Sequence, residues 1–450
     1  MTQCNGKSVT FSSLGRKKIQ ADFDGGHITS DAGMVLLREV DRHIGLVDAI
    51  DRCILDPRRA DRVNHQQRTL LTQRILAIAA GYEDLNDHDQ LRHDVLLQSL
   101  VQRPPHQQAD PLASSPTLCR LENRVDRAAL AKIAEVFVQQ FIASQHETPQ
   151  ELVLDFDATD DQVHGQQQGR FFHGYYDHYC FLPLYVFCGD QLLTAYLRPS
   201  NIDGAKHSRA ILKLLVRRFR QQWPNVRIVV RADSGFCRWR LMRWCDSHGV
   251  DYILGLARNK SLERLAWPLA QQSRQAFEDA GQKQRLFGEV HYAAQTWDRC
   301  RRVIVKAEHL DKGPNQRFVV TSLAGDPQHL YDTQYCARGD MENRIKEQQL
   351  DLFADRTSCH HFLANQFRLL LASAAYVLLE TLRREALHET ALARAQCGTI
   401  RLRLLKIGAR VVRSVRRVVL HLASGYPLKE LFRLIVGRLR SLPVQSNASG

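Results

Sequence analysis

Residues 152–161 have the sequence Leu-Val-Leu-Asp-Phe-Asp-Ala-Thr-Asp-Asp, in which apolar residues alternate with carboxylates. In a β-strand this alternation places Asp155 and Asp157 on one face, and Leu154 and Phe156 on the other. A carboxylate within an otherwise apolar strand costs free energy unless it is paired or binds a metal ion. The stretch therefore predicts a strand with an acidic site on one face.

The residues that follow predict a sheet with parallel members. Apolar runs at 181–188 and 191–198 flank Gly189-Asp190, which is typical of a β-hairpin. The pattern then predicts a helix at 205–220, a strand at 226–232, a helix at 238–248 and a strand at 252–256. A strand–helix–strand unit of this length joins parallel strands. Asp233 directly follows one of these strands, where ligands bind in open α/β sheets.

The rest of the chain alternates between sequence patterns typical of helices and patterns typical of strands. The first 150 residues are mostly helical in pattern, and a helix at 261–282 precedes antiparallel strands expected at 285–292, 300–307 and 317–322. A further helix is expected at 330–353, with one face that carries Tyr335, Arg338, Glu342 and Lys346. The long interval between Asp233 and Glu342 therefore contains a β-rich insertion.

Charge points to a polyanionic partner, with nucleic acid ahead of a membrane surface. The 450 residues carry a formal net charge of +14, which favours polyanions. After residue 391 the only acid is Glu430, against Arg394, Arg401, Arg403, Lys406, Arg410, Arg413, Arg416, Arg417, Lys429, Arg433, Arg438 and Arg440. These cations predict phosphate contacts, and a merely solvated surface is the alternative.

Composition also predicts the compartment. The 11 cysteines form no C-x-x-C pair, as expected for reduced thiols in a cytosol. Residues 1–18 lack the apolar region of a signal peptide. The longest apolar run, 369–379, is too short to span a bilayer. We expect a cytoplasmic protein that does not enter a membrane.

Three carboxylates stand out by context: Asp157 within a strand, Asp233 at a strand end and Glu342 beside cationic side chains. Two-metal phosphoryl transfer uses such a set, because two Mg²⁺ ions about 3.5–4 Å apart activate the attacking oxygen and stabilise the leaving one. Hard cations prefer the oxygen ligands of Asp and Glu. Asp155, on the same face as Asp157, is the alternative first ligand.

Three blocks of sequence resemble a known family. They are Asp-Ala-Thr at 157–159, Arg-Ala-Asp-Ser-Gly-Phe at 231–236 and Tyr-x-x-Arg-x-x-x-Glu at 335–342. They are similar to the signature blocks of DDE transposases, and most similar to insertion-sequence family 1380, whose catalytic region is called the transposase DDE domain, group 1. Three further segments share this likeness: His-Gly-Gln-Gln-Gln-Gly-Arg-Phe-Phe-His-Gly-Tyr-Tyr at 164–176, Leu-Pro-Leu-Tyr-Val-Phe-Cys-Gly at 182–189 and Arg-Leu-Leu-Lys-Ile-Gly-Ala at 403–409.

The resemblance implies an α/β fold with a ribonuclease H-like mixed sheet flanked by helices. It implies a transposase that binds terminal inverted repeats, then cleaves DNA and transfers strands into a target. Asp157, Asp233 and Glu342 would hold two Mg²⁺ ions, with Mn²⁺ as a substitute. Double-stranded DNA would be the partner of a homodimer or larger assembly associated with the nucleoid. A catalytically inactive or domesticated DNA-binding transposase, or a nuclease without joining activity, is the alternative.

The same resemblance assigns regions to the chain. It implies a mostly helical end-recognition domain (1–150), a catalytic core (151–257 and 330–382), a β-rich insertion (258–329) and a basic C-terminal segment (383–450). Tyr335, Arg338 and Lys346 would contact DNA phosphates. In related transposases a lysine lies seven residues after the glutamate, where this chain has Gln349. Trp267 and Trp297 of the insertion are candidates for base stacking, and core packing is the alternative for each.

Overall fold

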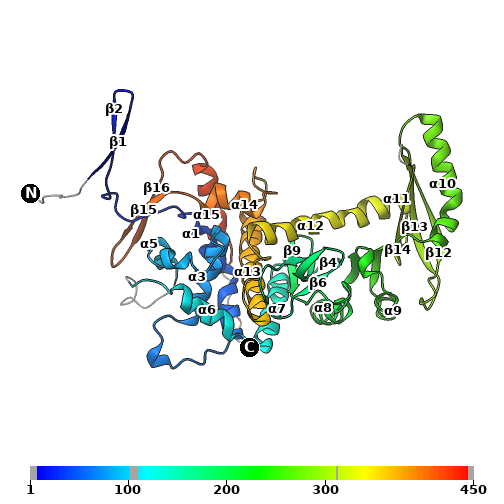
Figure 1. The fold of residues 1–450 in the computed structure, drawn as a ribbon, viewed down its shortest axis with the longest axis horizontal. Coiled ribbons are helices and arrows are strands. Elements are labelled where there is room, and N and C mark those ends of the chain that lie inside the picture. Colours follow the sequence, from blue (N-terminus) through cyan, green and yellow to red (C-terminus); the bar gives the residue numbers. More distant parts are fainter. Residues whose placement is uncertain (1–7, 102–109, 311–312, 444–450) are drawn as a thin grey trace, which may run out of the picture. The chain divides into compact units, whose positions relative to one another are not determined.

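The computed structural model describes residues 8–101, 110–310 and 313–443 (Figure 1). Contacts divide the chain into two compact units. The first unit combines residues 1–125 with 374–450, and the second comprises 126–373. Both ends of the chain therefore build one unit, and the stretch between them builds the other.

The first unit is mostly helical. Its N-terminal elements are β1 Val9–Leu14, β2 Lys17–Ala21, β3 Ile28–Thr29, α1 Met34–Ile44, α2 Leu46–Cys53, η1 Ala60–Arg62, α3 Gln67–Ala80, α4 His88–Leu91, α5 Val95–Leu100 and α6 Ser115–Arg124. Its C-terminal elements are α14 Cys397–Ile400, η7 Arg401–Leu405, β15 Ala409–Arg413, β16 Val418–Leu422 and α15 Lys429–Ser441. β15 pairs with both β16 and β3. This pairing attaches the basic C-terminal segment to the N-terminal helices, so the compact units differ from the regions predicted from the sequence.

The second unit surrounds one large sheet. Its elements before the candidate glutamate are α7 Arg127–Ala143, β4 Glu151–Ala158, β5 Asp161–Gln162, β6 Phe171–His173, β7 His178–Phe181, β8 Leu184–Cys188, β9 Gln191–Tyr196, α8 Ser208–Gln222, β10 Arg227–Ala232, η3 Ser234–Phe236, α9 Trp239–Ser247, β11 Asp251–Leu256, α10 Lys260–Ala280, β12 Arg285–Tyr292, β13 Arg301–Leu310 and β14 Gly313–Thr321. α7 belongs to this unit, although its pattern placed it in the predicted N-terminal domain.

Eight strands form the large sheet in the order β12-β13-β14-β11-β10-β4-β8-β9. β10 runs parallel to both β4 and β11, and the other neighbours are antiparallel. The expected antiparallel strands of 258–329 are present as β12, β13 and β14. They do not form a sheet of their own, because β14 pairs with β11 and so extends the main sheet.

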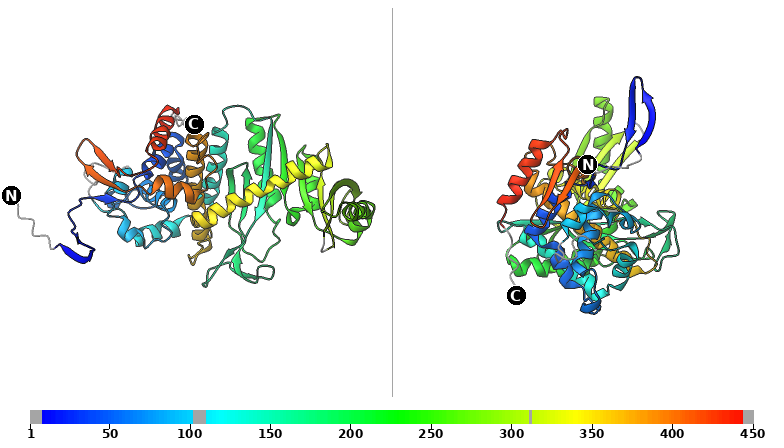
Figure 2. Two further views of the ribbon diagram at one scale, coloured as in Figure 1. Left: turned by 90° about the horizontal axis from the view of Figure 1, so that it is seen from above. Right: turned by 90° about the vertical axis from the view of Figure 1, so that its left-hand side faces the viewer.

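Helices cover both faces of this sheet. On one face, Leu152, Leu154 and Phe156 of β4 join a hydrophobic cluster with residues of α7, α8, α9 and α10. The other face is crossed by a continuous helical segment, yellow in Figure 2, made of α11 Pro327–His329, η4 Leu330–Tyr335, η5 Cys336–Arg338, α12 Gly339–Lys346 and η6 Glu347–Asp351. Leu330 and Tyr331 pack against the sheet on that face. The acidic face of β4 therefore lies under the helical segment that carries Glu342.

One helix has the length and apolar composition of a membrane span. Among the residues that the structure describes, α13 (Phe362–Ala386) alone meets these criteria, with 25 residues. It is longer than the apolar run noted in the sequence, but 83% of its most apolar window is buried within the protein. A core helix that is apolar on all sides has the same properties.

Candidate active site

Strand register brings Asp157 and Asp233 together. β4 and β10 are parallel neighbours, and their register pairs Arg231 with Asp155 and Ala232 with Phe156. The residue after Phe156 is Asp157 and the residue after Ala232 is Asp233, so the register places these two candidate carboxylates side by side. Neighbouring strands lie about 4.8 Å apart. Two carboxylates distant in sequence thus meet at the carboxyl ends of parallel strands, where α/β sheets bind ligands.

Asp155 lies on the same face as Asp157 but has a structural partner. Its two carboxylate oxygens accept hydrogen bonds from Arg231, at 2.5 Å from Nε and 2.7 Å from Nη2. Arg231 also donates to the carbonyl of Gln334, at 2.6 Å. Asp155 is 1% exposed and Arg231 is 9% exposed. The pair therefore joins β4, β10 and the covering helical segment in the interior.

Asp157 has the electrostatic environment of a functional carboxylate. Burial raises its pKa to about 7, Arg338 lowers it, and the charges of Asp233 and Glu342 raise it. Its Oδ1 accepts a hydrogen bond from the backbone of Ala158, at 2.9 Å. A pKa raised by burial and by like charges at a strand end is characteristic of catalytic sites, although ion-pair networks also produce it.

Asp233 begins the short helical turn η3. Its Oδ1 accepts a hydrogen bond from the backbone nitrogen of Gly235, at 2.9 Å, which fixes the side chain at the strand end. The hydrogen bond is that of an N-cap, in which an Asp oxygen satisfies an orphan N–H group. The sequence Asp-Ser-Gly thus has a local structural role that orients the carboxylate.

Glu342 faces the same region from α12. Its Oε1 lies 2.7 Å from Nη2 of Arg338, one helical turn earlier. Burial lowers the pKa of Arg338, but Glu342, Asp157 and Asp233 outweigh this effect and raise it. Arg338 therefore lies among all three candidate carboxylates, and the expected shared face of Arg338 and Glu342 is confirmed.

Tyr335 fits against β11 at a glycine. A Cβ atom on Gly255 would lie 2.6 Å from the Tyr335 hydroxyl and 2.8 Å from the backbone nitrogen of Ser234. Burial raises the pKa of Tyr335, and the nearby charge of Asp233 adds to this. Gly255 thus allows the tyrosine and the turn after Asp233 to approach each other closely.

Replacing Gly255 by alanine should destabilise the protein by about 1–3 kcal/mol, the usual cost of overpacking a tight site. The added methyl group must displace Tyr335 or the backbone at Ser234. Urea unfolding measures the loss of stability. Gly204→Ala is the matched control, because a Cβ there meets no atom within 4 Å. Equal stability of the two variants would contradict the assigned close contact.

Lys346 and Gln349 lie beyond Glu342 on the same helical segment. Lys346 is exposed. Gln349, which occupies the position of the lysine in the related signature, donates to the carbonyl of Asp160 at 3.1 Å and to Oδ1 of Asp161 at 2.9 Å. Gln349 therefore fastens the helical segment to the chain just after β4, a role that its sequence position did not indicate.

Comparison with known proteins identifies the family of this chain. The family model described as Transposase DDE domain group 1 matches residues 11–444. The chain belongs to this family. Among solved structures it is similar to the piggyBac transposase in a synaptic complex with hairpin DNA, with 11% sequence identity, a TM-score of 0.41, and coverage of 94% of this chain and 87% of that chain. No curated protein matches the chain.

The candidate carboxylates of this DDE domain have the ligand chemistry that a divalent metal ion requires. Their arrangement fits such an ion for the two aspartates but not for Glu342. Carboxylate oxygens are hard ligands of the kind that Mg²⁺ prefers. Asp157 and Asp233 meet by register, whereas Glu342 is held by Arg338. Within 8–101, 110–310 and 313–443, no group of three or more His, Cys, Asp and Glu side chains is arranged to hold a metal ion. The structure therefore brings Asp157 and Asp233 together and pairs Glu342 with Arg338.

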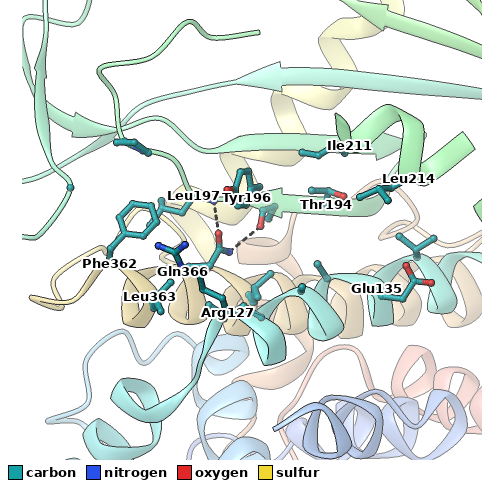
Figure 3. Close-up of a pocket in the computed structure, with 18 of the residues that line it drawn as sticks. Arg127, Glu135, Thr194, Tyr196, Leu197, Ile211, Leu214, Phe362, Leu363 and Gln366 are labelled. Atoms are coloured by element: carbon teal, nitrogen blue, oxygen red, sulfur yellow. Dashed lines mark hydrogen bonds between the residues drawn. The ribbon is translucent and has the colours of Figure 1, made fainter. Parts of the chain in front are cut away.

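A separate cavity of about 840 Å³ lies in the second unit of the DDE domain (Figure 3). α7, β9, α8 and the start of α13 line it, mainly with apolar side chains. Gln366 forms two hydrogen bonds with the backbone in and just after the edge strand β9. Its Oε1 accepts from the Leu197 nitrogen at 2.7 Å, and its Nε2 donates to the Ala195 carbonyl at 3.1 Å (Figure 3). None of the three candidate carboxylates lines this cavity.

Proposed function

We propose that this protein is a DNA transposase that binds the terminal inverted repeats of an insertion sequence. It would then cleave and join DNA by metal-dependent phosphoryl transfer. The observation that carries the proposal is that Asp157 and Asp233 lie side by side at the ends of two parallel strands, beneath the helix that carries Glu342. The chain also belongs to the DDE family. The motifs at 157–159, 231–236 and 335–342 support insertion-sequence family 1380 as the closer group.

Strand order supports a ribonuclease H-like catalytic core. Within the large sheet, the order β9-β8-β4-β10-β11 places an antiparallel hairpin beside three parallel strands. α8 connects β9 to β10, and α9 connects β10 to β11. In this arrangement the first and fourth strands of the core end side by side, at Asp157 and Asp233.

The site residues would divide two tasks. Asp157, Asp233 and Glu342 would hold two Mg²⁺ ions, with Mn²⁺ as a substitute, and these ions would activate a water or a 3′-hydroxyl and stabilise the leaving oxygen. Arg338, Tyr335 and Lys346 would bind phosphates of the DNA. Because Arg338 now pairs with Glu342, a phosphate that competes for its guanidinium would release the glutamate toward the aspartates.

The basic C-terminal segment would provide a second contact with DNA. Some of its cations have structural partners: Arg401 donates to the carbonyl of Ala79 at 2.9 Å, and Lys406 lies 2.6 Å from Asp31. The cations on and beside the β15–β16 hairpin are exposed, namely Arg410, Arg416 and Arg417. We infer that this hairpin contacts phosphates, which predicts affinity that falls steeply with salt. Joining two DNA ends would require a dimer or larger assembly.

The test is cleavage of a duplex that ends in the inverted repeats flanking the gene. Mg²⁺ or Mn²⁺ should allow cuts at the repeat ends, and EDTA should abolish them. An Asp233→Ala protein should bind this DNA without cutting it, as resolved by mobility shift and denaturing gel. Cleavage by that variant would overturn the proposed site.

The same assay separates the alternatives. Wild-type protein that binds the repeats but never cuts would be an inactive or domesticated DNA-binding transposase. Wild-type protein that cuts but never joins ends to a target duplex would be a nuclease. Neither result is expected, because the three carboxylates are present and two of them meet by register.

A further inference from the structure

The helical segment that carries Glu342, yellow in Figure 2, contains two π-helical turns. η4 (Leu330–Tyr335) precedes α12, and η6 (Glu347–Asp351) follows it. A π-helical turn contains one residue more than an α-helical turn, so it rotates the side chains on one side of it relative to those on the other. The direction of Glu342, relative to the strands that contact the two turns, therefore depends on both turns being held in place.

Both π-helical turns are hydrogen-bonded to β10 or to the residues after β4. In η4, the carbonyl of Gln334 accepts from Nη1 of Arg231 on β10, at 2.6 Å. In η6, Nε2 of Gln349 donates to the carbonyl of Asp160 at 3.1 Å and to Oδ1 of Asp161 at 2.9 Å. The helical segment is thus fastened to the sheet on both sides of α12.

The side-chain amide of Gln349 uses its donors within the protein. A glutamine amide has two N–H bonds, and two acceptors face it, the Asp160 carbonyl and the Asp161 carboxylate. Gln349 is half-buried, whereas Lys346, about one turn earlier, is exposed. The two residues therefore differ in task, because Gln349 binds the sheet and Lys346 extends into solvent.

The acceptors of Gln349 lie on a rigid anchor. Asp161 is 0% exposed, and burial raises its pKa well above the usual range while the hydrogen bond from Gln349 lowers it. β5 pairs Asp161 with Phe181 of β7. Nε2 of His178, also on β7, lies 2.7 Å from Oδ2 of Asp160. A buried carboxylate is costly without a hydrogen bond, so the contact between Asp161 and Gln349 holds η6 strongly in one position.

We propose that Gln349 and Asp161 are positioning residues that set the direction of Glu342 with respect to Asp157. This inference rests on the proposed function, in which these carboxylates bind metal ions. Gln349 acts through the backbone of η6 and α12, because its own hydrogen bonds go to Asp160 and Asp161. Residues that orient metal ligands in this way typically change metal affinity about 10–100-fold when they are replaced.

Gln349→Met tests the proposal, because methionine has a similar length and removes both hydrogen bonds. Binding of Mn²⁺ is followed by EPR in the complex with a repeat-end duplex that has already been cut, against the same duplex alone. The affinity for Mn²⁺ should fall about tenfold. Binding of the uncut duplex in EDTA should keep its affinity and its salt dependence. Lys346→Ala should give the converse result, with unchanged Mn²⁺ affinity and a salt slope reduced by about 1.

Variants of Asp161 show whether the hydrogen bond is responsible. Asp161→Asn keeps an oxygen that accepts from Gln349 and should retain the affinity for Mn²⁺. Asp161→Ala removes the acceptor and should weaken Mn²⁺ binding as Gln349→Met does. The double variant Asp161→Ala/Gln349→Met should be no weaker than either single variant, because residues that act through one contact are not additive.

Two further variants separate positioning from loss of stability. Leu350→Ala removes a side chain that is 72% exposed on the same π-helical turn, and it should change neither affinity. Val305→Ala removes two methyl groups from a residue that is 0% exposed on β13. The cavity should lower the midpoint of urea unfolding while the affinity for Mn²⁺ stays the same.

The outcomes are distinct. Equal Mn²⁺ affinity of Gln349→Met and a wild-type protein that cleaves DNA would overturn the proposal without affecting the proposed function. An equal loss in Val305→Ala would also overturn it, since lower stability would then explain the effect. So would a reduced salt slope in Gln349→Met, which would make Gln349 a phosphate contact. Wild-type protein that neither binds Mn²⁺ nor cleaves DNA would contradict the proposed function itself.

Discussion

Replacing Asp157 by asparagine should lower metal-dependent DNA cleavage by at least about 10³-fold, because a metal ligand contributes several kcal/mol to the transition state. DNA binding should stay within about twofold, since the cations proposed to bind phosphates are untouched. Rates of single-turnover cleavage and equilibrium binding of the inverted repeats measure the two effects. Cleavage within about tenfold of wild type would exclude Asp157 as a ligand.

The same variant should alter how stability depends on pH in metal-free protein. The pKa of Asp157 is raised from 3.8 to about 7, so the folded state holds the proton more tightly than the unfolded state does. The protonated Asp157 carboxyl therefore contributes to the unfolding free energy below about pH 4, and this contribution is lost as pH rises to about 7. As the pH rises from 5 to 8 in EDTA, the unfolding free energy of Asp157→Asn should therefore increase by about 2–3 kcal/mol relative to that of the wild type. A constant difference in unfolding free energy would contradict the raised pKa.

Replacing Asp155 by alanine should affect stability and leave the catalytic step intact, in contrast to Asp157→Asn. We expect it to destabilise the fold by about 3–5 kcal/mol, because Arg231 would remain buried without its anion. Both oxygens of Asp155 bond to Arg231, and both residues are interior. Urea unfolding at neutral pH measures the loss. Activity should fall only as far as the folded fraction does.

An exposed pair on the same two strands provides the control. Glu151 and Arg227 face each other across β4 and β10 at 3.0 Å, with half of the arginine side chain in solvent. Glu151→Ala should cost less than about 1 kcal/mol, as surface ion pairs do. If Asp155→Ala were as mild as Glu151→Ala and cleavage were lost, Asp155 would be the ligand in place of Asp157.

Local pattern was sufficient to predict much of the second unit. Alternation at 152–157 placed Leu154 and Phe156 in the core, and they are 0% and 1% exposed. Helical spacing correctly brought Arg338 and Glu342 into contact. These features depend on residues within one strand or one helical turn, where the period of the backbone decides which side chains are neighbours.

Other features depend on register between distant segments and could not be predicted locally. Asp155 and Asp157 are equivalent by alternation, and only the pairing of β4 with β10 gives Asp155 an arginine partner. Gln349 had no evident role until the fold placed it beside Asp160. For the same reason the antiparallel strands were predicted but their attachment to β11 was not.

The split of the first unit has a consequence for biosynthesis. β3 is made early, but its partner β15 leaves the ribosome only after all of 126–373 has been synthesised. Domains fold during synthesis as their residues emerge. The large sheet that carries Asp157 and Asp233 can therefore form before β15 and β16 are available to complete the first unit. A prematurely terminated chain would then carry residues 157, 233 and 342 but lack the basic β15–β16 hairpin. The first unit is thus completed only after the second unit has been synthesised.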